Sequence, residues 1–341
     1  MPEEFLRLPA GDRREALAVA TAASGRPVHL LEKDVWVVWT LAVLFNAPFA
    51  EQLVFKGGTS LSKAYRIIRR FSEDIDITYD IRAIVPELVG DYPEPLPPSR
   101  SQEKRWTREI RSRLANWVRG IVLPLVEAAL ASQRLTARPR ADGDKIVVDY
   151  EPLATGSGYV SPAVLIEFGA RSTGEPFELR PVRCDAAEYL PGVAFPAVTA
   201  RAMRPERTFW EKATAIHVFC AQGEFRGGER FSRHWHDVTR LDASGFADAA
   251  IADHKLATAV ARHKAMFFAE KDAHGAPIDY DKAVSGALQL VPDGAALDRL
   301  AHDYQGMVED GLLLEKGTEP FGLLMERCRE VQRRANAGRV G

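Results

Sequence analysis

The chain has 341 residues, 46% of them hydrophobic and 27% charged, with a formal net charge of −2. This length suffices for two domains with buried cores, and the near-neutral charge excludes a protein that binds polyanions through its overall charge. Three cysteines without metal-ligand spacing (Cys184, Cys220 and Cys328) are typical of a reducing compartment. The most apolar run, residues 35–45, is too short to cross a bilayer. We therefore expect a cytoplasmic protein that has no membrane partner.

The N-terminal part of the sequence alternates between helical and extended patterns. The predicted elements are helices over residues 12–23 and 29–45, a strand over 52–55, a helix over 59–70 and a strand over 75–79. The apolar run of helix 29–45 carries Trp36 and Trp39, which predicts a buried helix. In strand 75–79 apolar residues alternate with polar ones, mostly acids, so one face of that strand is expected to be acidic.

The middle of the chain begins with a proline-rich segment, residues 91–101, which predicts an exposed loop. The elements predicted after it are a helix over 103–131 with a bend at Pro124, and strands over 145–150 and 163–168, joined by a loop that contains residues 156–158.

From Pro205 onward the pattern is helical. Helices are predicted over residues 206–221, 232–241, 246–268, 295–307 and 321–337. The change of pattern places a domain boundary within residues 190–205. We expect an α/β (α+β) fold, with a small mixed sheet in residues 1–195 and a helical domain in residues 196–341.

A glycine pair follows strand 52–55 and opens the next predicted helix. Glycines allow a sharp turn and a close approach of backbone N–H groups to phosphate oxygens, and nearby hydroxyls add donors. A plain strand-to-helix turn would have the same sequence, and no Walker loop is present. We assign nucleotide binding to Lys56, Gly57, Gly58, Thr59, Ser60 and Lys63.

Two acids, Asp74 and Asp76, follow shortly after this turn. Side chains two apart on a strand face the same way, and two carboxylates so placed suit Mg²⁺ that also binds a phosphate. A solvated strand face is the alternative. Glu167, an acid within an otherwise apolar strand, is our candidate for a third metal ligand; an ion pair or a strand edge would also explain it.

Later charged residues are candidates for the same site. Lys212 is suited to bind a triphosphate as a point charge, and Asp237 to act as a base or to orient one; surface charge or ion pairing is the alternative for each. His234 and His236 lie two apart on a predicted helix, where side chains diverge, so we exclude a paired-histidine metal site.

Residues 56–63 (KGGTSLSK) and 73–76 (EDID) together resemble the AbiEii/AbiGii-type, MenT-like toxin nucleotidyltransferases of the DNA polymerase β-like nucleotidyltransferase superfamily. Segments 32–34 and 303–307 resemble further patterns of that family. The resemblance implies that Ser60 contacts phosphate, Asp74 and Asp76 bind Mg²⁺ and are catalytic, Lys212 holds the triphosphate, and Asp237 completes the catalytic site.

The resemblance also implies partners and cofactors. It implies a nucleoside triphosphate as substrate, Mg²⁺ (or Mn²⁺) as cofactor, a cognate antitoxin, and transfer of a nucleotide to the 3′ end of tRNA or to another RNA, which blocks translation. The alternatives are a small-molecule or protein hydroxyl as acceptor, a non-catalytic nucleotide- or RNA-binding module, and a metal-dependent nuclease that uses the same acids.

Basic residues dominate the predicted helix 103–131 and its flanks. Ten lysines and arginines lie between residues 96 and 140, against three glutamates. Five of them lie roughly opposite the apolar face of the helix: Lys104, Arg105, Arg108, Arg111 and Arg119. This arrangement indicates a surface for a polyanion, although a solvated helix face is the alternative. We assign RNA binding to Lys104, Arg105, Arg108 and Arg111.

Overall fold

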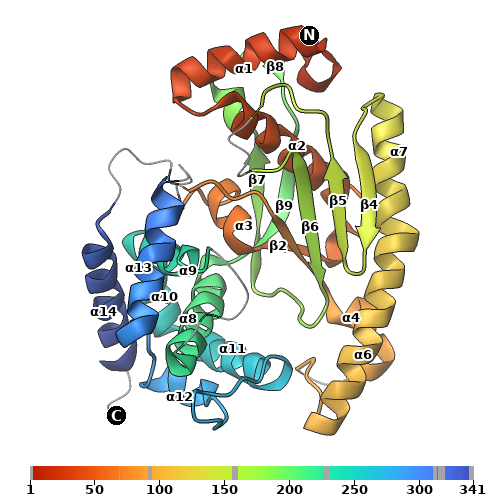
Figure 1. The fold of residues 1–341 in the computed structure, drawn as a ribbon. Helices are drawn as coiled ribbons and strands as arrows, with labels where there is room; N and C mark the ends of the chain where they lie inside the picture. The colour runs from red at the N-terminus through yellow and green to blue at the C-terminus, as the bar shows by residue number, and fades with distance from the viewer. Residues whose placement is uncertain are drawn as a thin grey trace. The chain divides into compact units, whose positions relative to one another are not determined.

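The computed structural model describes residues 3–68, 70–90, 94–155, 160–223, 225, 230–309, 313 and 319–337 (Figure 1). The predicted loop residues 91–93 and 156–158 lie outside this set. The chain forms two compact units. The sheet unit comprises Met1–Tyr65, Phe71–Pro95 and Arg105–Met203, and the helical unit comprises Arg66–Arg70, Leu96–Lys104 and Arg204–Gly341. The expected mixed α/β class, with helices toward the C-terminus, is confirmed.

A mixed sheet of seven strands spans the sheet unit in the order β4-β5-β6-β3-β2-β9-β7 (Figure 1). Its strands are β2 (Leu53–Lys56), β3 (Ile75–Tyr79), β4 (Arg138–Asp142), β5 (Lys145–Asp149), β6 (Ala163–Gly169), β7 (Phe177–Arg183) and β9 (Ala197–Met203). The pairs β2–β9 and β3–β6 are parallel and the other pairs antiparallel. A separate parallel pair joins β1 (Glu3–Glu4) to β8 (Val193–Ala194). The four predicted strands are confirmed; β4, β7 and β9 are additional.

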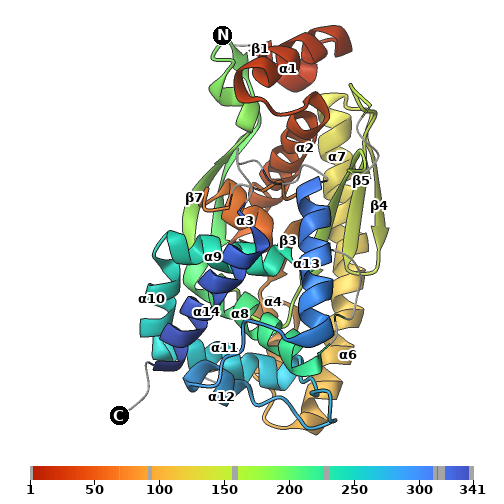
Figure 2. The same cartoon turned by 60° about the vertical axis from the view of Figure 1, so that its left-hand side comes forward.

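The helix α2 is buried on all sides. The N-terminal helices are α1 (Ala10–Ser24), α2 (Val28–Phe45), α3 (Gly57–Lys63), α4 (Ile81–Ile84), α5 (Pro86–Val89), α6 (Arg100–Trp117) and α7 (Leu123–Gln133). Residues 30–41 of α2 are all buried, because α2 packs against β9 and β6 as well as α1 and α7 (Figure 2). The prediction of a buried helix that carries Trp36 and Trp39 is confirmed.

The helices α6 and α7 form one long rod in the figures (Figures 1 and 2). A π-helical turn, Val118–Val122, joins them. Pro124 lies directly after this turn, and proline cannot donate the hydrogen bond of a continuous helix. The bend expected at Pro124 stays a prediction. Trp117 anchors the rod to the sheet: its ring stacks on Tyr79 with centroids 4.3 Å apart.

Among the described residues, one helical stretch, Arg100–Gln133, is long and apolar enough to cross a membrane by length and composition alone. A single such helix is weak evidence for a membrane span, because helices of proteins without a membrane also meet these two criteria.

The predicted helix 59–70 is wrong in its second half. The helix α3 ends at Lys63, and Arg66 has a left-handed backbone with a φ of 55°. A left-handed residue cannot continue a right-handed helix. Beyond it the chain leaves the sheet unit, since residues Arg66–Arg70 belong to the helical unit.

The helical unit contains α8 (Pro205–Gln222), α9 (Arg233–Ala243), α10 (Phe246–Ala252), α11 (His254–Phe267), α12 (Tyr280–Ser285), α13 (Gly294–Glu309) and α14 (Phe321–Ala337). Helices α8, α9, α13 and α14 confirm their predictions. The single helix predicted over 246–268 is wrong, because the chain breaks at Asp253, whose side chain accepts a hydrogen bond from the Leu256 N–H and caps α11. The short α12 is additional.

Candidate functional site

The turn between β2 and α3 requires glycine at position 57. Gly57 has a φ of 76°, in the left-handed region that side chains disfavour. A β-carbon at this position would also lie 2.0 Å from Oδ2 of Asp76, far inside van der Waals contact. The backbone of the turn and the carboxylate of Asp76 therefore touch, and any side chain at position 57 would displace the carboxylate.

Strand pairing explains this proximity. In the antiparallel pair β2–β3, Lys56 lies opposite Asp76, so the residue that follows Lys56 meets the Asp76 side chain. Asp74 lies immediately before β3 and not within it. Its carbonyl oxygen accepts a hydrogen bond from Oγ1 of Thr59 at 2.5 Å, which ties the chain before β3 to α3.

The two hydroxyls of the turn are directed into the protein. Thr59 and Ser60 are both buried. Besides Asp74, Thr59 reaches Oγ of Ser72 at 2.8 Å, and Oγ of Ser60 donates to the carbonyl of Gly57 at 3.0 Å. These bonds shape the turn. The role of both hydroxyls as phosphate ligands stays a prediction.

A row of charged residues crosses four strands of the sheet. Lys56 pairs with Asp76, Asp76 with Glu167, and Glu167 with Lys145, and residues directly opposite one another share a face of the sheet. The row therefore reads cation, anion, anion, cation. The carboxylate of Glu167 forms an ion pair with Lys145, which is one of the alternatives we considered for this residue.

Asp74 and Asp76 have the chemistry expected of ligands to a divalent cation. Carboxylate oxygens are the ligands that Mg²⁺ prefers, usually together with substrate phosphates and water. Oδ2 of Asp76 lies directly beside the backbone of Gly57, which lacks a side chain. No group of three or more His, Cys, Asp or Glu residues in the described ranges is arranged to hold a metal on protein ligands alone, so the assignment of Glu167 as a third ligand stays a prediction.

Lys63 lies in a buried cluster of ion pairs. Its Nζ is 2.5 Å from Oδ1 of Asp34 and 2.7 Å from Oδ1 of Asp185, and Arg26 also pairs with Asp185. Burial raises the pKa of Asp34 to about 6, although Lys63 opposes this shift. The cluster joins α3 to α2, and the nucleotide-binding role assigned to Lys63 stays a prediction.

The neighbouring residues of α2 also have buried charges. Lys33 forms an ion pair with Glu73 and donates to the carbonyl of Ser161 at 2.9 Å. Oε2 of Glu32 accepts a hydrogen bond from the Leu153 N–H at 2.8 Å, and burial raises the pKa of this carboxyl group to about 7. Segment 32–34 thus connects α2 to distant parts of the sheet unit.

In the helical unit, α8 and α9 bring Lys212 and Asp237 together. The Nζ of Lys212 is 2.8 Å from Oδ2 of Asp237. Arg70 binds the same carboxylate in a bidentate manner, with its Nε 2.7 Å from Oδ1 and its Nη2 2.8 Å from Oδ2. Burial alone would raise the pKa of Asp237, but Arg70 and Lys212 hold it well below its usual range. Our sequence analysis did not single out Arg70.

The histidines beside Asp237 are uncharged at neutral pH. Burial lowers the pKa of His236 to about 4 and that of His234 well below its usual range. Within the described part of the chain, neither ring nitrogen of His236 has a hydrogen-bond partner. The start of α9 is fixed instead by Asp303, whose carboxylate accepts hydrogen bonds from the backbone N–H groups of Arg230 and Ser232.

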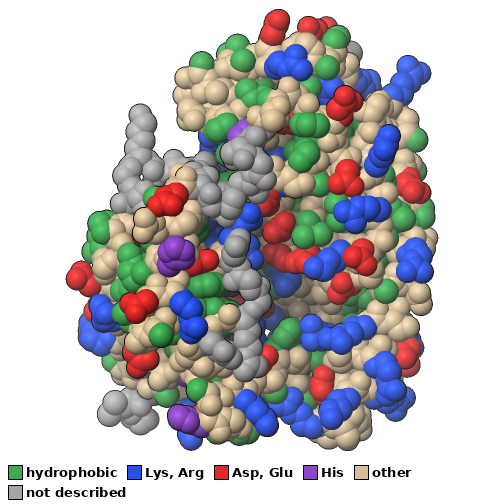
Figure 3. Space-filling view, viewed as in Figure 1, with side chains coloured by type: hydrophobic (Ala, Val, Ile, Leu, Met, Phe, Trp, Pro, Cys, Tyr) green, Lys and Arg blue, Asp and Glu red, His purple; other side chains and the backbone are tan. Residues whose placement is uncertain are grey.

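The four basic residues assigned to RNA binding, Lys104, Arg105, Arg108 and Arg111, are all exposed on α6. In the described structure, no hydrogen bond or ion pair engages Lys104, Arg108 or Arg111, whereas Arg113 on the same helix pairs with Glu87 and Glu109. Figure 3 shows Lys and Arg side chains at the lower right of the molecule, where α6 runs. Their charges are therefore available to an external anion.

Comparison with known proteins identifies the family of this chain. No curated protein matches the sequence significantly. Among solved structures, the chain is similar to MenT4, a nucleotidyltransferase toxin from Mycobacterium tuberculosis, with 17% identity over 97% of this chain and 99% of that one and a TM-score of 0.38. Residues 39–324 match the model of the family described as nucleotidyl transferase AbiEii toxin, Type IV TA system. Since this match spans most of the sequence, the chain belongs to the AbiEii family of nucleotidyltransferase toxins of type IV toxin–antitoxin systems.

Proposed function

We propose that this nucleotidyltransferase toxin transfers a nucleoside monophosphate from a nucleoside triphosphate to RNA, and that its acceptor is the 3′ end of tRNA. The acceptor hydroxyl would attack the α-phosphate, the bond to the β-phosphate would break, and pyrophosphate would leave with the electron pair. A tRNA extended in this way could no longer be aminoacylated, so translation would stop in a cell that lacks the cognate antitoxin.

The contact between Gly57 and Asp76 carries this proposal. A turn with no side chain, at van der Waals distance from a carboxylate, lets backbone N–H groups approach a phosphate while the acid remains beside it. A purely structural turn does not need an acid at this distance. Lys56, one residue earlier and opposite Asp76, adds a cation beside the same turn.

Asp74 and Asp76 would hold Mg²⁺, for which Mn²⁺ would substitute. The bound ion would supply charge neutralisation on the triphosphate and a lowered pKa for the acceptor hydroxyl. The chain itself would orient the reactants: Thr59 fixes the backbone of Asp74, and the strand pairing fixes Asp76. Glu167 would join the acids only after release from Lys145.

We further propose that Lys212 binds the triphosphate and that Asp237 positions its ammonium group. Asp237 is fully buried and forms ion pairs with Arg70 and Lys212, which hold its pKa well below its usual range, so it stays ionised. On the acceptor side, the exposed residues Lys104, Arg105, Arg108 and Arg111 would contact RNA phosphates.

Incubation with each α-³²P-labelled nucleoside triphosphate in turn, Mg²⁺ and purified tRNA tests the proposal. We expect a labelled tRNA that is longer than the input by whole nucleotides. Asp76→Asn should abolish labelling, whereas Asp149→Asn, which removes an exposed carboxylate from β5, should not. Label in protein or in a small molecule instead of tRNA would reject the RNA acceptor, shortened tRNA would indicate a nuclease, and full activity of Asp76→Asn would reject the metal assignment.

A further inference from the structure

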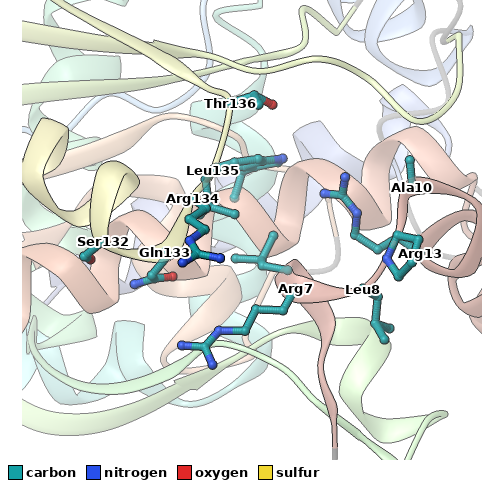
Figure 4. A pocket seen from close by; sticks show the side chains of 12 residues that line it. Arg7, Leu8, Ala10, Arg13, Ser132, Gln133, Arg134, Leu135 and Thr136 are labelled. Carbon is teal, nitrogen blue, oxygen red and sulfur yellow. The ribbon is translucent and has the colours of Figure 1, made fainter.

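A cavity lies in the sheet unit, and none of the residues that line it belongs to the Gly57 turn. Its volume is about 690 Å³. Residues 6–10 and Arg13 from the N-terminal segment line one side, Trp36 of α2 lines another, and residues 132–136 at the end of α7 complete it (Figure 4). This volume lies within the range of about 300–1,000 Å³ that is typical of small-molecule sites.

Three arginines, Arg7, Arg13 and Arg134, line this cavity, and none of its described lining residues is acidic. In Figure 4 the side chain of Arg7 extends toward the segment that carries Gln133 and Arg134. Three cations around one cavity repel one another, which is costly unless an anion binds among them. The lining therefore points to a negatively charged occupant.

The arginines are poorly neutralised by the protein itself. Arg7 pairs with Glu4 at 2.8 Å, but both side chains are more than half exposed, so this pair is weak. The Nε of Arg13 is buried without a hydrogen-bond partner in the described structure. Arg13 interacts electrostatically with Glu32, but burial of this carboxyl group raises its pKa to about 7. Arg134 forms no ion pair with any described residue.

Further groups around the cavity suit a phosphate ester. The helix α1 begins at Ala10 beside the cavity, and no side chain caps its first turn, so its N-terminal amides add partial positive charge. Ser132, Gln133 and Thr136 supply polar edges, and Trp36 supplies an aromatic wall. Guanidinium groups bind phosphate in a bidentate manner, and the apolar wall suits an organic group attached to it.

We propose that this cavity binds a phosphate monoester about the size of a mononucleotide, at a site separate from the Gly57–Asp76 turn. Binding there needs no divalent cation, because arginines rather than carboxylates meet the phosphate. The proposal does not depend on the transfer reaction, and its test does not use that reaction.

Calorimetric titration of the full chain with adenosine 5′-monophosphate in the presence of EDTA tests it, with adenosine as the uncharged comparison. We expect the monophosphate to bind and adenosine to bind at least tenfold more weakly. Arg13→Gln and Arg134→Gly should each weaken binding of the monophosphate about tenfold or more. Arg138→Gln removes an exposed arginine outside the cavity and should leave binding unchanged.

Arg134→Gly separates a loss of binding from a loss of folding. Arg134 has a φ of 56°, which glycine adopts more easily, so this variant should melt no lower than the wild type while it loses affinity. No binding of the monophosphate to the wild type, equal binding of adenosine, or undiminished binding by Arg13→Gln and Arg134→Gly would overturn the proposal.

Discussion

Gly57 and Asp76 are in such close contact that the Asp76 carboxylate can occupy its position only because Gly57 has no side chain. Gly57 belongs to the motif 56–63 and Asp76 to the motif 73–76, and the antiparallel pairing of β2 with β3 brings the two motifs together. The turn therefore helps to set the position of the Asp76 carboxylate, and a change that moves the backbone at position 57 should also move this carboxylate.

Gly57→Ala should abolish nucleotidyl transfer in a protein that still folds. The new methyl group would displace the Asp76 carboxylate, and alanine at a φ of 76° would cost about 1–2 kcal/mol of unfolding free energy. We expect a loss of transfer activity of more than a hundredfold, measured beside the unfolding free energy from urea titration.

Gly25→Ala is the matched control for this change. Gly25 has a φ of 75°, but no atom lies within 4 Å of its β-carbon position. The two variants should lose similar stability, and only Gly57→Ala should lose activity. Equal activity loss in both would show that backbone strain, and not displacement of Asp76, is responsible.

Asp237→Asn should destabilise the protein strongly. The variant removes the buried carboxylate charge that both Arg70 and Lys212 contact, and breaking a buried ion pair typically costs about 3–5 kcal/mol. Urea unfolding measures this loss. Asp149→Asn, which breaks an exposed pair with Arg140, should change stability by less than about 1 kcal/mol. A small effect of Asp237→Asn would mean that the buried cluster is not formed.

Glu32→Gln should make the protein more stable at pH 8 and leave it unchanged at pH 4. The folded pKa of Glu32 is about 7, above its ordinary value of 4.5. Its contribution to stability is therefore fully present below pH 4.5 and is lost as the pH rises through about 7. Glutamine keeps the acceptor for the Leu153 N–H without the buried charge.

The expected gain for Glu32→Gln at pH 8 is about 1–3 kcal/mol, which urea unfolding at a series of pH values would detect. The difference between variant and wild type should grow between pH 5 and pH 7. A constant difference across this range would contradict the assignment of the titration to Glu32.

Reversal of Arg105, Arg108 and Arg111 to glutamate should weaken tRNA binding and its salt dependence. Each lost phosphate contact lowers the slope of log affinity against log salt by about 0.9 on a duplex and about 0.7 on a single strand. Filter binding across a salt series measures both. A second triple variant is the control. It changes Lys255, Lys271 and Arg329, which are exposed on the helical unit, to glutamate and so alters the net charge by the same amount. If this second triple variant weakens binding equally, the effect is one of net charge and not of α6.

The turn and its closeness to Asp76 could be predicted because both motifs are local in sequence. The glycines and Asp76 lie within twenty residues, and strand alternation gives the direction of Asp76 on β3. The pairing of Asp74 with Asp76 as metal ligands stays a prediction. The length of α3 could not be predicted, because the apolar spacing of Ile67 and Ile68 continues past the point where Arg66 turns left-handed.

Strands β4 and β7 and the cation Arg70 were not predicted from the sequence, for different reasons. The strands β4 and β7 are the two edges of the sheet, and each contains a proline, Pro139 and Pro181, which usually argues against a strand and is tolerated at an edge. Arg70 binds Asp237 across 167 residues of sequence, and a lone arginine among other basic residues has no pattern that reveals such a partner.

The assignment of Arg66–Arg70 to the helical unit has a practical consequence for anyone who dissects this toxin. A fragment that starts at Arg204 would include nearly all the helices of that unit but would lack the guanidinium that closes on Asp237. A gene fragment that begins at Arg204 would therefore encode a helical unit in which the buried Asp237 lacks its Arg70 partner. The two halves have to be expressed as one polypeptide, or the short segment has to be supplied in trans.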